Sequence, residues 1–219
     1  MNIKSIITFE NVYKVYEKGG SKINALTDVS FSLEPGTLST IHGPSGSGKT
    51  TLIYLMGLLK KPNTGEIIIK GIKTSNLDEK KRCKLIRDEI GFIFRRSNLL
   101  PNLTALENVM LPMSSSDNKK AEKLLEKVEV SDWNRFPINL SFEEEQKVAL
   151  ARSLVNNPTF ILADEPTADL DSKTAQNFMN LLKKLDNVTI LITSDDNLLG
   201  EFNKFSNQNF KLKDGVLTG

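Results

Sequence analysis

The sequence is poor in cysteine and histidine and has no long hydrophobic run. Of the 219 residues only Cys83 is a cysteine, so no disulfide can form within the chain, which favours a reducing compartment. No apolar stretch approaches the roughly 18–20 residues that cross a bilayer. Residues 1–9 carry one lysine and interrupted hydrophobicity, unlike a signal peptide. We therefore expect a cytoplasmic protein that relies on another polypeptide for any membrane-spanning helices.

The sequence also lacks an excess of charge of either sign. Its 29 lysines and arginines are nearly balanced by 27 acidic residues, for a net charge of +2. Because no dominant positive field results, we expect no nucleic-acid partner. Hydrophobic residues make up 39% and charged residues 26%, as in an ordinary soluble protein. The length suits one large domain, or a core that carries a subdomain.

The order of hydrophobic patterns divides the chain into three regions. The first, up to about residue 70, is rich in β-branched and aromatic residues and predicts strands, interrupted by a glycine-rich loop and a helix. Residues 78–155 have mainly helical periodicity. The last region alternates strands and helices. Predicted strands are Ile6–Phe9, Val12–Tyr16, Val29–Leu33, Leu38–His42, Glu66–Lys70, Phe160–Asp164, Val188–Thr193 and a terminal hairpin turning at Asp214-Gly215; predicted helices are Thr50–Leu59, Asn118–Val130 and Lys173–Leu185.

A glycine-rich loop lies between the first predicted helix and the strand before it. It satisfies the pattern G-x-x-x-x-G-K-[ST], whose glycines let backbone N–H groups turn towards phosphate oxygens. Lys49 is expected to reach the β- and γ-phosphates of ATP, and the Thr50 hydroxyl to bind Mg²⁺. An ordinary glycine-rich turn is the alternative, which the strand–loop–helix context disfavours. The candidate phosphate-binding residues are Gly43, Pro44, Ser45, Gly46, Ser47, Gly48, Lys49 and Thr50.

Two carboxylates follow the predicted strand Phe160–Asp164, an apolar run that ends in an acid, as buried parallel strands often do. Asp164 would lie at the sheet edge where ligands bind in open α/β folds, and could hold Mg²⁺ through water. Glu165 is placed to orient or activate the attacking water. A surface turn rich in acidic residues is the alternative interpretation of this pair.

The phosphate loop and the segments Ile161–Thr167 and Ala168–Ser172 occur in the order found in the ATPase subunits of ABC transporters, which the chain resembles over nearly its whole length. The segment Asn98–Val109 is similar to the corresponding segment in one branch of that family, whose members power lipoprotein release, macrolide efflux and peptide export. The resemblance implies one α/β domain of the P-loop NTPase class over residues 1–219. A RecA-like core with an antiparallel β subdomain would cover about 1–90 and 156–219, and an inserted α-helical subdomain about 91–155.

The resemblance also implies cofactors and partners. ATP and Mg²⁺ are the cofactors. An integral membrane permease is one partner, and a second ATPase subunit is the other, in a homodimer or heterodimer that encloses two ATP molecules head to tail. The chain would lie at the inner face of the cell membrane through its permease. Tyr16 matches the aromatic residue that stacks on adenine, with a plain strand aromatic as the alternative; Thr51 extends the nucleotide contacts, and Asp169–Asp171 match the loop that communicates across the dimer.

Three functional positions of that family are changed. The glutamine that senses magnesium and the attacking water, after the strand Gly91–Phe94, is Arg95 here. A guanidinium cannot ligate a cation and would repel Mg²⁺, although it could contact the γ-phosphate. The switch histidine after Thr193 is Ser194, which is too short to reach the γ-phosphate as an imidazole does. His42 is a conceivable replacement, but a residue at a strand end is more simply part of the strand.

The third change lies in the family's Leu-Ser-Gly-Gly-Gln signature, which caps the ATP bound on the partner subunit. Here it reads Leu140-Ser141-Phe142-Glu143-Glu144. Phe142 adds bulk where the nucleotide should approach, and Glu143 and Glu144 bring negative charge towards an anion. The spacing of Ser141 and Glu144 predicts a capping box, in which the helix satisfies its own N–H groups. We expect the helix to persist without its ligand function.

Three functions are compatible with these residues. The chain is an energising ATPase subunit of a membrane transporter, or a nucleotide-binding regulatory or structural subunit of a permease with little hydrolysis. A soluble ABC protein of translation or DNA repair is disfavoured, because a second ATPase unit or a long coiled-coil insertion is missing. An intact partner would repair neither composite ATP site completely, so we expect Mg-ATP binding with slow hydrolysis in either assembly. The retained Glu165 argues against a pure binder.

Overall fold

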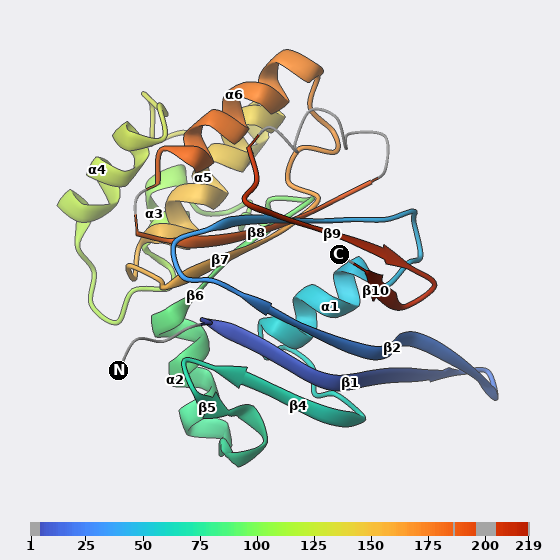
Figure 1. Ribbon diagram of the computed structural model, residues 1–219. Coiled ribbons are helices and arrows are strands. Elements are labelled where there is room, and N and C mark those ends of the chain that lie inside the picture. Colours follow the sequence, from blue (N-terminus) through green and yellow to red (C-terminus); the bar gives the residue numbers. More distant parts are fainter. Residues whose placement is uncertain (1–4, 186, 196–204, 219) are drawn as a thin grey trace.

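Two β-sheets and a set of helices make up the part of the chain that the structure describes (Figure 1). The computed structural model describes residues 5–185, 187–195 and 205–218. The strands are β1 (Ile7–Lys18), β2 (Ser21–Leu33), β3 (Leu38–His42), β4 (Thr64–Ile69), β5 (Ile72–Lys73), β6 (Ile90–Phe94), β7 (Phe160–Asp164), β8 (Thr189–Ser194), β9 (Gln208–Lys213) and β10 (Val216–Thr218). The helices are α1 (Lys49–Met56), α2 (Glu79–Glu89), α3 (Ala105–Met110), α4 (Asn118–Lys127), α5 (Phe142–Leu154) and α6 (Ser172–Lys183), with short 3-10 turns η1 (Thr74–Asn76) and η2 (Pro137–Asn139).

The larger sheet has six strands in the order β10-β9-β3-β8-β7-β6. The five strands from β9 to β6 are parallel, and β10 returns antiparallel beside β9. β3, β7 and β8 are buried at every position, as strands covered on both faces must be. Their register pairs His42 with Ser194 and Asp164 with Thr193, so the carboxyl ends of three strands meet at one edge.

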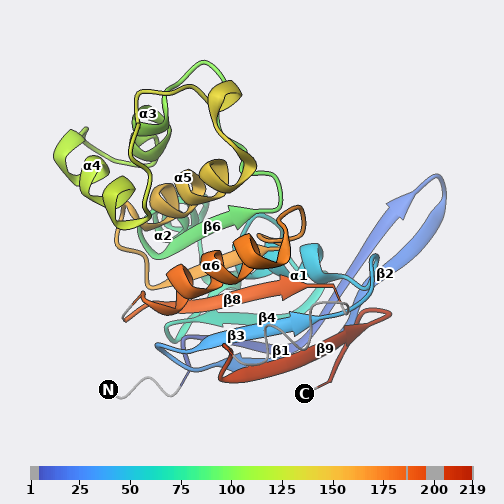
Figure 2. The same cartoon turned by 90° about the horizontal axis from the view of Figure 1, so that it is seen from above.

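The smaller sheet is antiparallel, in the order β2-β1-β4-β5. β1 pairs with β2 on one side and with β4 on the other. The β1–β2 hairpin extends beyond the rest of the sheet, as the blue ribbons in Figure 2 show. This arm carries Tyr16 and Ile23 as register partners, which places both near the end of the hairpin.

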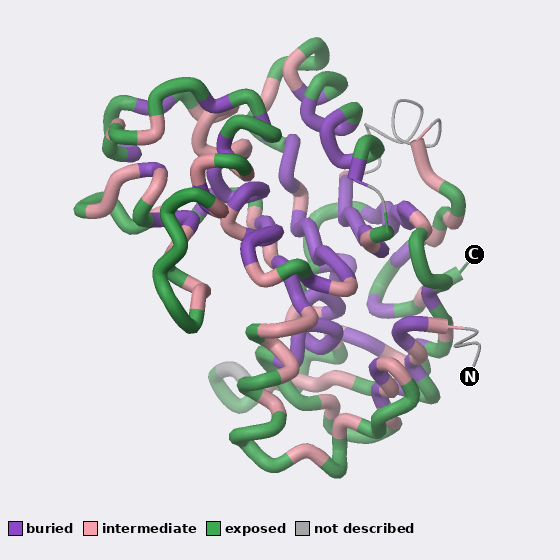
Figure 3. The backbone as a smooth tube through the Cα atoms, turned by 90° about the vertical axis from the view of Figure 1, so that its left-hand side faces the viewer, coloured by how far each residue is buried: buried purple, intermediate pink, exposed green. Residues whose placement is uncertain are grey.

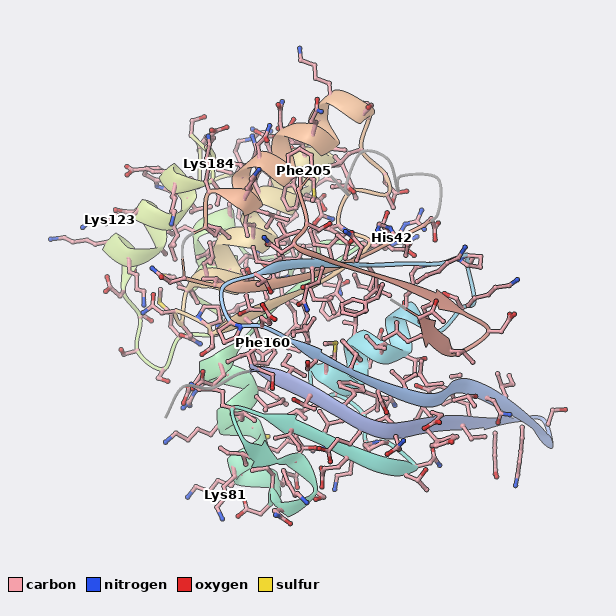
Figure 4. All side chains as sticks on the ribbon, in the orientation of Figure 1. His42, Lys81, Lys123, Phe160, Lys184 and Phe205 are labelled. Atoms are coloured by element: carbon pink, nitrogen blue, oxygen red, sulfur yellow. The ribbon has the colours of Figure 1, made fainter. Side chains whose placement is uncertain are left out.

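Residues of β7 alternate between two hydrophobic cores. Phe160 and Leu162 pack in the core shared with α1 and the antiparallel sheet, whereas Ile161 and Ala163 pack in the core beneath α3 to α6. α1 therefore lies between the two sheets, and α5 and α6 cover the opposite face of the larger sheet (Figures 1 and 2). Figure 3 shows the buried residues concentrated along these inner layers, and Figure 4 labels Phe160 between the sheets.

The helices α3, α4 and α5 form a group next to β6 at one end of the larger sheet (Figure 2). Asn108, fully buried in α3, ties this group to the preceding loop, because its side chain exchanges hydrogen bonds with the backbone of Leu100 (2.8 and 3.1 Å). We propose that the group is the inserted helical subdomain of about residues 91–155. The first residues of that range, Gly91 to Phe94, pair with β7 in the main sheet.

Most elements predicted from the hydrophobic pattern are confirmed. Leu38–His42 and Phe160–Asp164 coincide with β3 and β7, and the Asp214-Gly215 turn joins β9 to β10 with positive φ at both residues (50° and 77°). The two predicted N-terminal strands form the single strand β1. A register shift between Phe9 and Val12 accounts for the apparent break in the pattern.

Candidate nucleotide-binding site

The glycine-rich loop leaves the larger sheet at the end of β3 and enters α1. β3 is held between β8 and β9, and the Gly43 N–H donates to the Ser194 carbonyl (3.3 Å), so the loop starts from a fixed point. Gly46 and Gly48 have φ of 80° and 109°, values that residues with a Cβ rarely adopt. A Cβ on Gly48 would also overlap the Ala25 carbonyl oxygen. Conformation and space therefore both require glycine here.

Lys49, the first residue of α1, places its ammonium group under the loop. Nζ donates to the carbonyls of Gly43 (2.6 Å) and Pro44 (3.2 Å) and to Asp195 Oδ1 (2.7 Å). Glu165 Oε1 lies 3.2 Å from the same Nζ. Only 4% of the side chain is exposed, and a buried ammonium requires such partners. Phosphate oxygens are the kind of ligand that can share or replace these contacts.

Asp164 and Glu165 stand at the end of β7 and are positioned through Thr193 of β8. The Thr193 hydroxyl donates to Asp164 Oδ1 (2.7 Å). The Glu165 N–H donates to Thr193 Oγ1 (3.1 Å) and to the Thr193 carbonyl (3.2 Å). Glu165 has a φ of 48°, a left-handed turn that is uncommon for a residue with a side chain. The turn directs its carboxylate towards Lys49.

Arg95 follows β6 and lies at the same sheet edge. Its guanidinium donates twice to Asp169, from Nε to Oδ2 (3.0 Å) and from Nη2 to Oδ1 (2.7 Å). Nη1 also lies 3.5 Å from Glu165 Oε2. The hydrogen bond from Arg95 holds the pKa of Asp169 below its usual value, and Asp169 in turn raises the pKa of Arg95. The Gln146 side chain fixes the Arg95 backbone by donating to its carbonyl (2.7 Å).

Most of the predicted nucleotide contacts line one cavity of about 500 Å³. The structure thus brings together the loop, the carboxylates after β7, Tyr16 on the β1 arm and Arg95. Of the described loop residues, Gly43, Pro44 and Ser47 do not belong to its lining. The lining residues are Tyr16, Ile23, Asn24, Ala25, Ser45, Gly46, Gly48, Lys49, Thr50, Thr51, Arg95, Asp164 and Glu165.

The donors in this cavity fit ATP and Mg²⁺. Mg²⁺ prefers oxygen ligands and takes few of them from the protein, and the Thr50 hydroxyl and Asp164 carboxylate are of that kind. Ser47, which does not line the cavity, has a buried hydroxyl that makes no hydrogen bond within the described part of the chain. The Tyr16 ring offers a flat face for a base, with the Lys14 ammonium 5.3 Å from its centroid.

A second cavity of similar volume lies between α2, β6 and α5. Its lining includes Cys83, Phe92, Phe94 and Arg152, and is mostly apolar. It contains none of the described loop residues or carboxylates named above. The residues expected to bind phosphate therefore line the first cavity.

The match to a family model decides what kind of protein carries this site. The model described as ABC transporter covers residues 26–168. That span holds the glycine-rich loop, Arg95, the segment around Ser141 and the carboxylates after β7. The chain belongs to the ABC transporter family.

Its curated relatives are ATP-binding proteins of that family. The uncharacterised ABC transporter ATP-binding protein MJ0796 of Methanocaldococcus jannaschii is 41% identical over 225 residues, covering 96% of this chain and 94% of the relative. The lipoprotein-releasing system ATP-binding protein LolD of Legionella pneumophila is 39% identical, covering 88% and 90%. The macrolide export ATP-binding/permease protein MacB of Bdellovibrio bacteriovorus is 37% identical, covering 97% of this chain and 33% of the relative.

Solved structures confirm the fold. The dimeric structure of MJ0796 superposes with a TM-score of 0.87 at 41% identity, covering 97% of each chain. A second MJ0796 dimer, in a post-hydrolysis state with ADP and phosphate, also has a TM-score of 0.87. The predicted α/β P-loop NTPase fold and the branch of lipoprotein release and macrolide efflux are therefore both confirmed.

The segment Leu140–Glu144, which the resemblance implies is an altered signature, forms the predicted capping box. The Ser141 hydroxyl accepts from the Glu144 N–H (3.2 Å), and Glu144 Oε2 accepts from the Ser141 N–H (2.8 Å). Glu144 Oε1 also accepts from Arg135 (2.8 Å). The backbone hydrogen bond from Ser141 is the largest cause that lowers the pKa of Glu144. Glu143 turns to Lys147 one turn later (2.8 Å), and Phe142 is half-buried, so the start of α5 is occupied by the chain's own side chains.

Ser194 and His42 are neighbours across β3 and β8. Ser194 is 3% exposed, and its hydroxyl donates to the Asp195 carbonyl (3.3 Å). His42 is 1% exposed, with Nε2 3.0 Å from the hydroxyl of Thr40 in the same strand. Neither Ser194 nor His42 belongs to the lining of the nucleotide cavity. This burial favours the interpretation of His42 as part of the strand.

Five residues that contact or line the site were missed by sequence reasoning. Asp195 and Thr193 contact Lys49 and Asp164 from β8 and its end. An acidic or hydroxyl side chain at the end of an apolar strand could have marked both residues as candidates for the site. Which residues they contact depends on β8 lying between β3 and β7, and the sequence does not show this order. Three further residues line the cavity from β2, and nothing in their type points to a nucleotide: Ile23, Asn24 and Ala25.

Proposed function

We propose that this chain is the Mg-ATP-binding subunit of an ABC transporter and drives or gates a separate membrane permease, with slow hydrolysis. One observation carries the proposal: Lys49, Thr50, Asp164 and Glu165 line a single cavity at the carboxyl edge of the larger sheet. In that cavity Lys49 would hold the β- and γ-phosphates, and Thr50 and Asp164 would hold Mg²⁺. Glu165 would orient the attacking water.

The relatives support a permease partner and a second ATPase subunit. The name of MacB joins an ATP-binding part to a permease, and this chain matches about a third of its length. LolD is named as the ATP-binding protein of a lipoprotein-releasing system, and MJ0796 forms dimers. None of the helices within the described ranges reaches the length and hydropathy needed to cross a bilayer. We propose that the chain binds the inner face of the membrane through its permease, paired with an identical or a related subunit.

Two features support slow hydrolysis. The Glu165 carboxylate lies between two cations, Lys49 at 3.2 Å and Arg95 at 3.5 Å. These contacts compete with a water molecule for the group that would act as its base. At the N-terminus of α5, which in the family caps the partner's ATP, the Glu144 carboxylate instead accepts from the Ser141 N–H (2.8 Å).

A non-hydrolysing regulatory or structural subunit of a permease complex is the second candidate. The self-capped α5 and the buried Ser194 favour it, because both remove contacts to the γ-phosphate. The presence of Glu165 at the end of β7 opposes it. The two candidates differ only in whether phosphate is released.

The test is phosphate release by the purified chain, alone and with the permease that copurifies with it. We expect slow release that falls to background in Glu165→Gln while ATP binding persists. Glu126→Gln, on the exposed face of α4, is the matched control and should leave release unchanged. Release that is zero in both assemblies would establish the regulatory role, and fast turnover by the chain alone would contradict slow hydrolysis.

A further inference from the structure

Arg95 lies in the nucleotide cavity at the position where the resemblance to ABC ATPases implies a glutamine. It lines the cavity together with Lys49 and Glu165. Its side chain is half-exposed (51%), whereas that of Lys49 is 4% exposed. Of the two cations in the described cavity lining, Arg95 is therefore the one with freedom to change partners.

The two carboxylates that hold Arg95 do so unequally. Asp169 accepts two hydrogen bonds from the guanidinium, at 2.7 and 3.0 Å, whereas Glu165 accepts only one, at 3.5 Å. A guanidinium presents its donors in a planar fork that fits a carboxylate and a phosphate in the same way. A phosphate that enters the cavity can therefore replace Asp169 at this fork without any change in donor geometry.

The position of Arg95 points to the last phosphate of the nucleotide. Lys49 sits beneath the loop, and Glu165, placed to orient the water that attacks the γ-phosphate, lies between Lys49 and Arg95. A phosphate chain held by Lys49, with its last phosphate next to Glu165, would therefore end within reach of Arg95. ADP ends one phosphate earlier, so it offers Arg95 nothing to bind.

We propose that Arg95 binds the γ-phosphate and makes this site prefer ATP to ADP, and that Asp169 restrains Arg95 until ATP arrives. The inference rests on the proposed function, because it requires Mg-ATP in this cavity. ATP binding then frees the Asp169 carboxylate, which follows the sheet edge in the loop that leads to α6. Since Arg95 carries positive charge of its own, part of the ATP preference persists without Mg²⁺.

The competing explanation is that Arg95 only fastens the end of β6 to the loop before α6. Removing such a structural link would lower the melting temperature and weaken ATP and ADP equally. The two explanations therefore separate on the ratio of the two affinities. That ratio does not depend on hydrolysis.

The experiment measures the dissociation constants of ATP and ADP by calorimetry on the purified chain, in EDTA and, with a non-hydrolysable ATP analogue, in Mg²⁺. Arg95→Gln should weaken ATP by about 10- to 100-fold, as loss of a charged hydrogen-bond pair does, and leave ADP within about twofold. Arg96→Gln is the matched control, because it removes the same charge from the exposed neighbouring residue. It should change neither affinity.

Asp169→Asn tests the restraint separately. It should strengthen ATP by about two- to fivefold, the value of an exposed ion pair, and this gain should disappear in the Arg95→Gln background. Equal effects of Arg95→Gln on ATP and ADP, no effect on either, or an equal loss in Arg96→Gln would overturn the γ-phosphate role. A gain from Asp169→Asn that survives without Arg95 would overturn the restraint. A wild-type chain that binds neither nucleotide would overturn the proposed function, and this inference with it.

Discussion

Ser141 and Glu144 bind each other twice at the first turn of α5, through the Ser141 hydroxyl (3.2 Å) and the Glu144 carboxylate (2.8 Å). The pair satisfies backbone N–H groups that a helix of this family would otherwise offer to the ATP of a partner subunit. Arg135 adds a hydrogen bond from the preceding segment and holds the carboxylate in place. The first turn of the helix is thus stabilised by the chain's own side chains, at the place that we propose faces the partner's ATP.

Replacing Ser141 with alanine removes one half of this capping box. We expect Ser141→Ala to cost about 1 kcal/mol of the free energy of unfolding, since it leaves the Glu144 N–H without its cap. For a chain of this size that corresponds to a fall of roughly 2–4 °C in the melting temperature. Ser115→Ala, at an exposed loop position, is the control and should leave the melting temperature unchanged. An equal melting temperature for the two variants would contradict the structural role of the cap.

The stability that Glu144 contributes should depend on pH. The pKa of Glu144 in the folded chain lies below its ordinary value of 4.5, chiefly because the Ser141 N–H donates to the carboxylate. A lowered folded pKa means that the contribution is fully present above pH 4.5 and is lost as the pH falls through the folded value. Glu144→Gln keeps a hydrogen-bond acceptor but has no charge. Its melting temperature should therefore fall furthest below that of the wild type near neutral pH, and the difference should shrink below pH 4.5. Glu126→Gln should show no such convergence.

Restoring the family's signature should raise hydrolysis. We expect the combined change Phe142→Gly, Glu143→Gly and Glu144→Gln to increase phosphate release about tenfold or more, because it frees N–H donors for the developing charge of a partner's γ-phosphate. The glycines should also lower stability, by up to about 1 kcal/mol each. The same triple change in a Lys49→Ala background is the control and should release no phosphate. An unchanged rate would mean that Arg95 and Ser194 alone limit hydrolysis.

Lys49 supplies the positive charge that pairs with Glu165 and Asp195 at the cavity. Lys49→Ala should abolish detectable ATP binding, because it removes the ammonium that faces the phosphates and leaves Glu165 and Asp195 repelling them. Lys60→Ala, exposed just beyond α1, removes the same charge away from the cavity and should bind ATP normally. Calorimetric titration of both variants checks this. Retained ATP binding in Lys49→Ala would place the nucleotide elsewhere.

Local spacing made some of these features predictable, whereas long-range packing hid the others. The loop Gly43–Thr50 and the Ser141–Glu144 box are each set by residues within one turn or loop, so their spacing alone predicts them. The Arg95–Asp169 pair joins residues 74 positions apart, and it exists because β6 and β7 are adjacent in the sheet. No pattern along the chain encodes that adjacency. The residue change at Arg95 was visible in the sequence, but its partner was not.

Thr193 is the clearest case of a functional contact that required the structure. Its hydroxyl, fully buried, donates to Asp164 and lies against the Glu165 N–H. Thr193→Val keeps the shape but leaves the Asp164 carboxylate without this donor, at a cost of about 1–3 kcal/mol, whereas the Glu165 N–H keeps its hydrogen bond to the backbone carbonyl of residue 193. We expect it to weaken Mg²⁺-dependent ATP binding more than binding in EDTA, because Asp164 loses the bond that aims it at the metal. Thr193→Ser retains the hydroxyl and should recover most of the affinity; equal Mg²⁺ dependence in Thr193→Val and the wild type would show that Asp164 is positioned by the backbone alone.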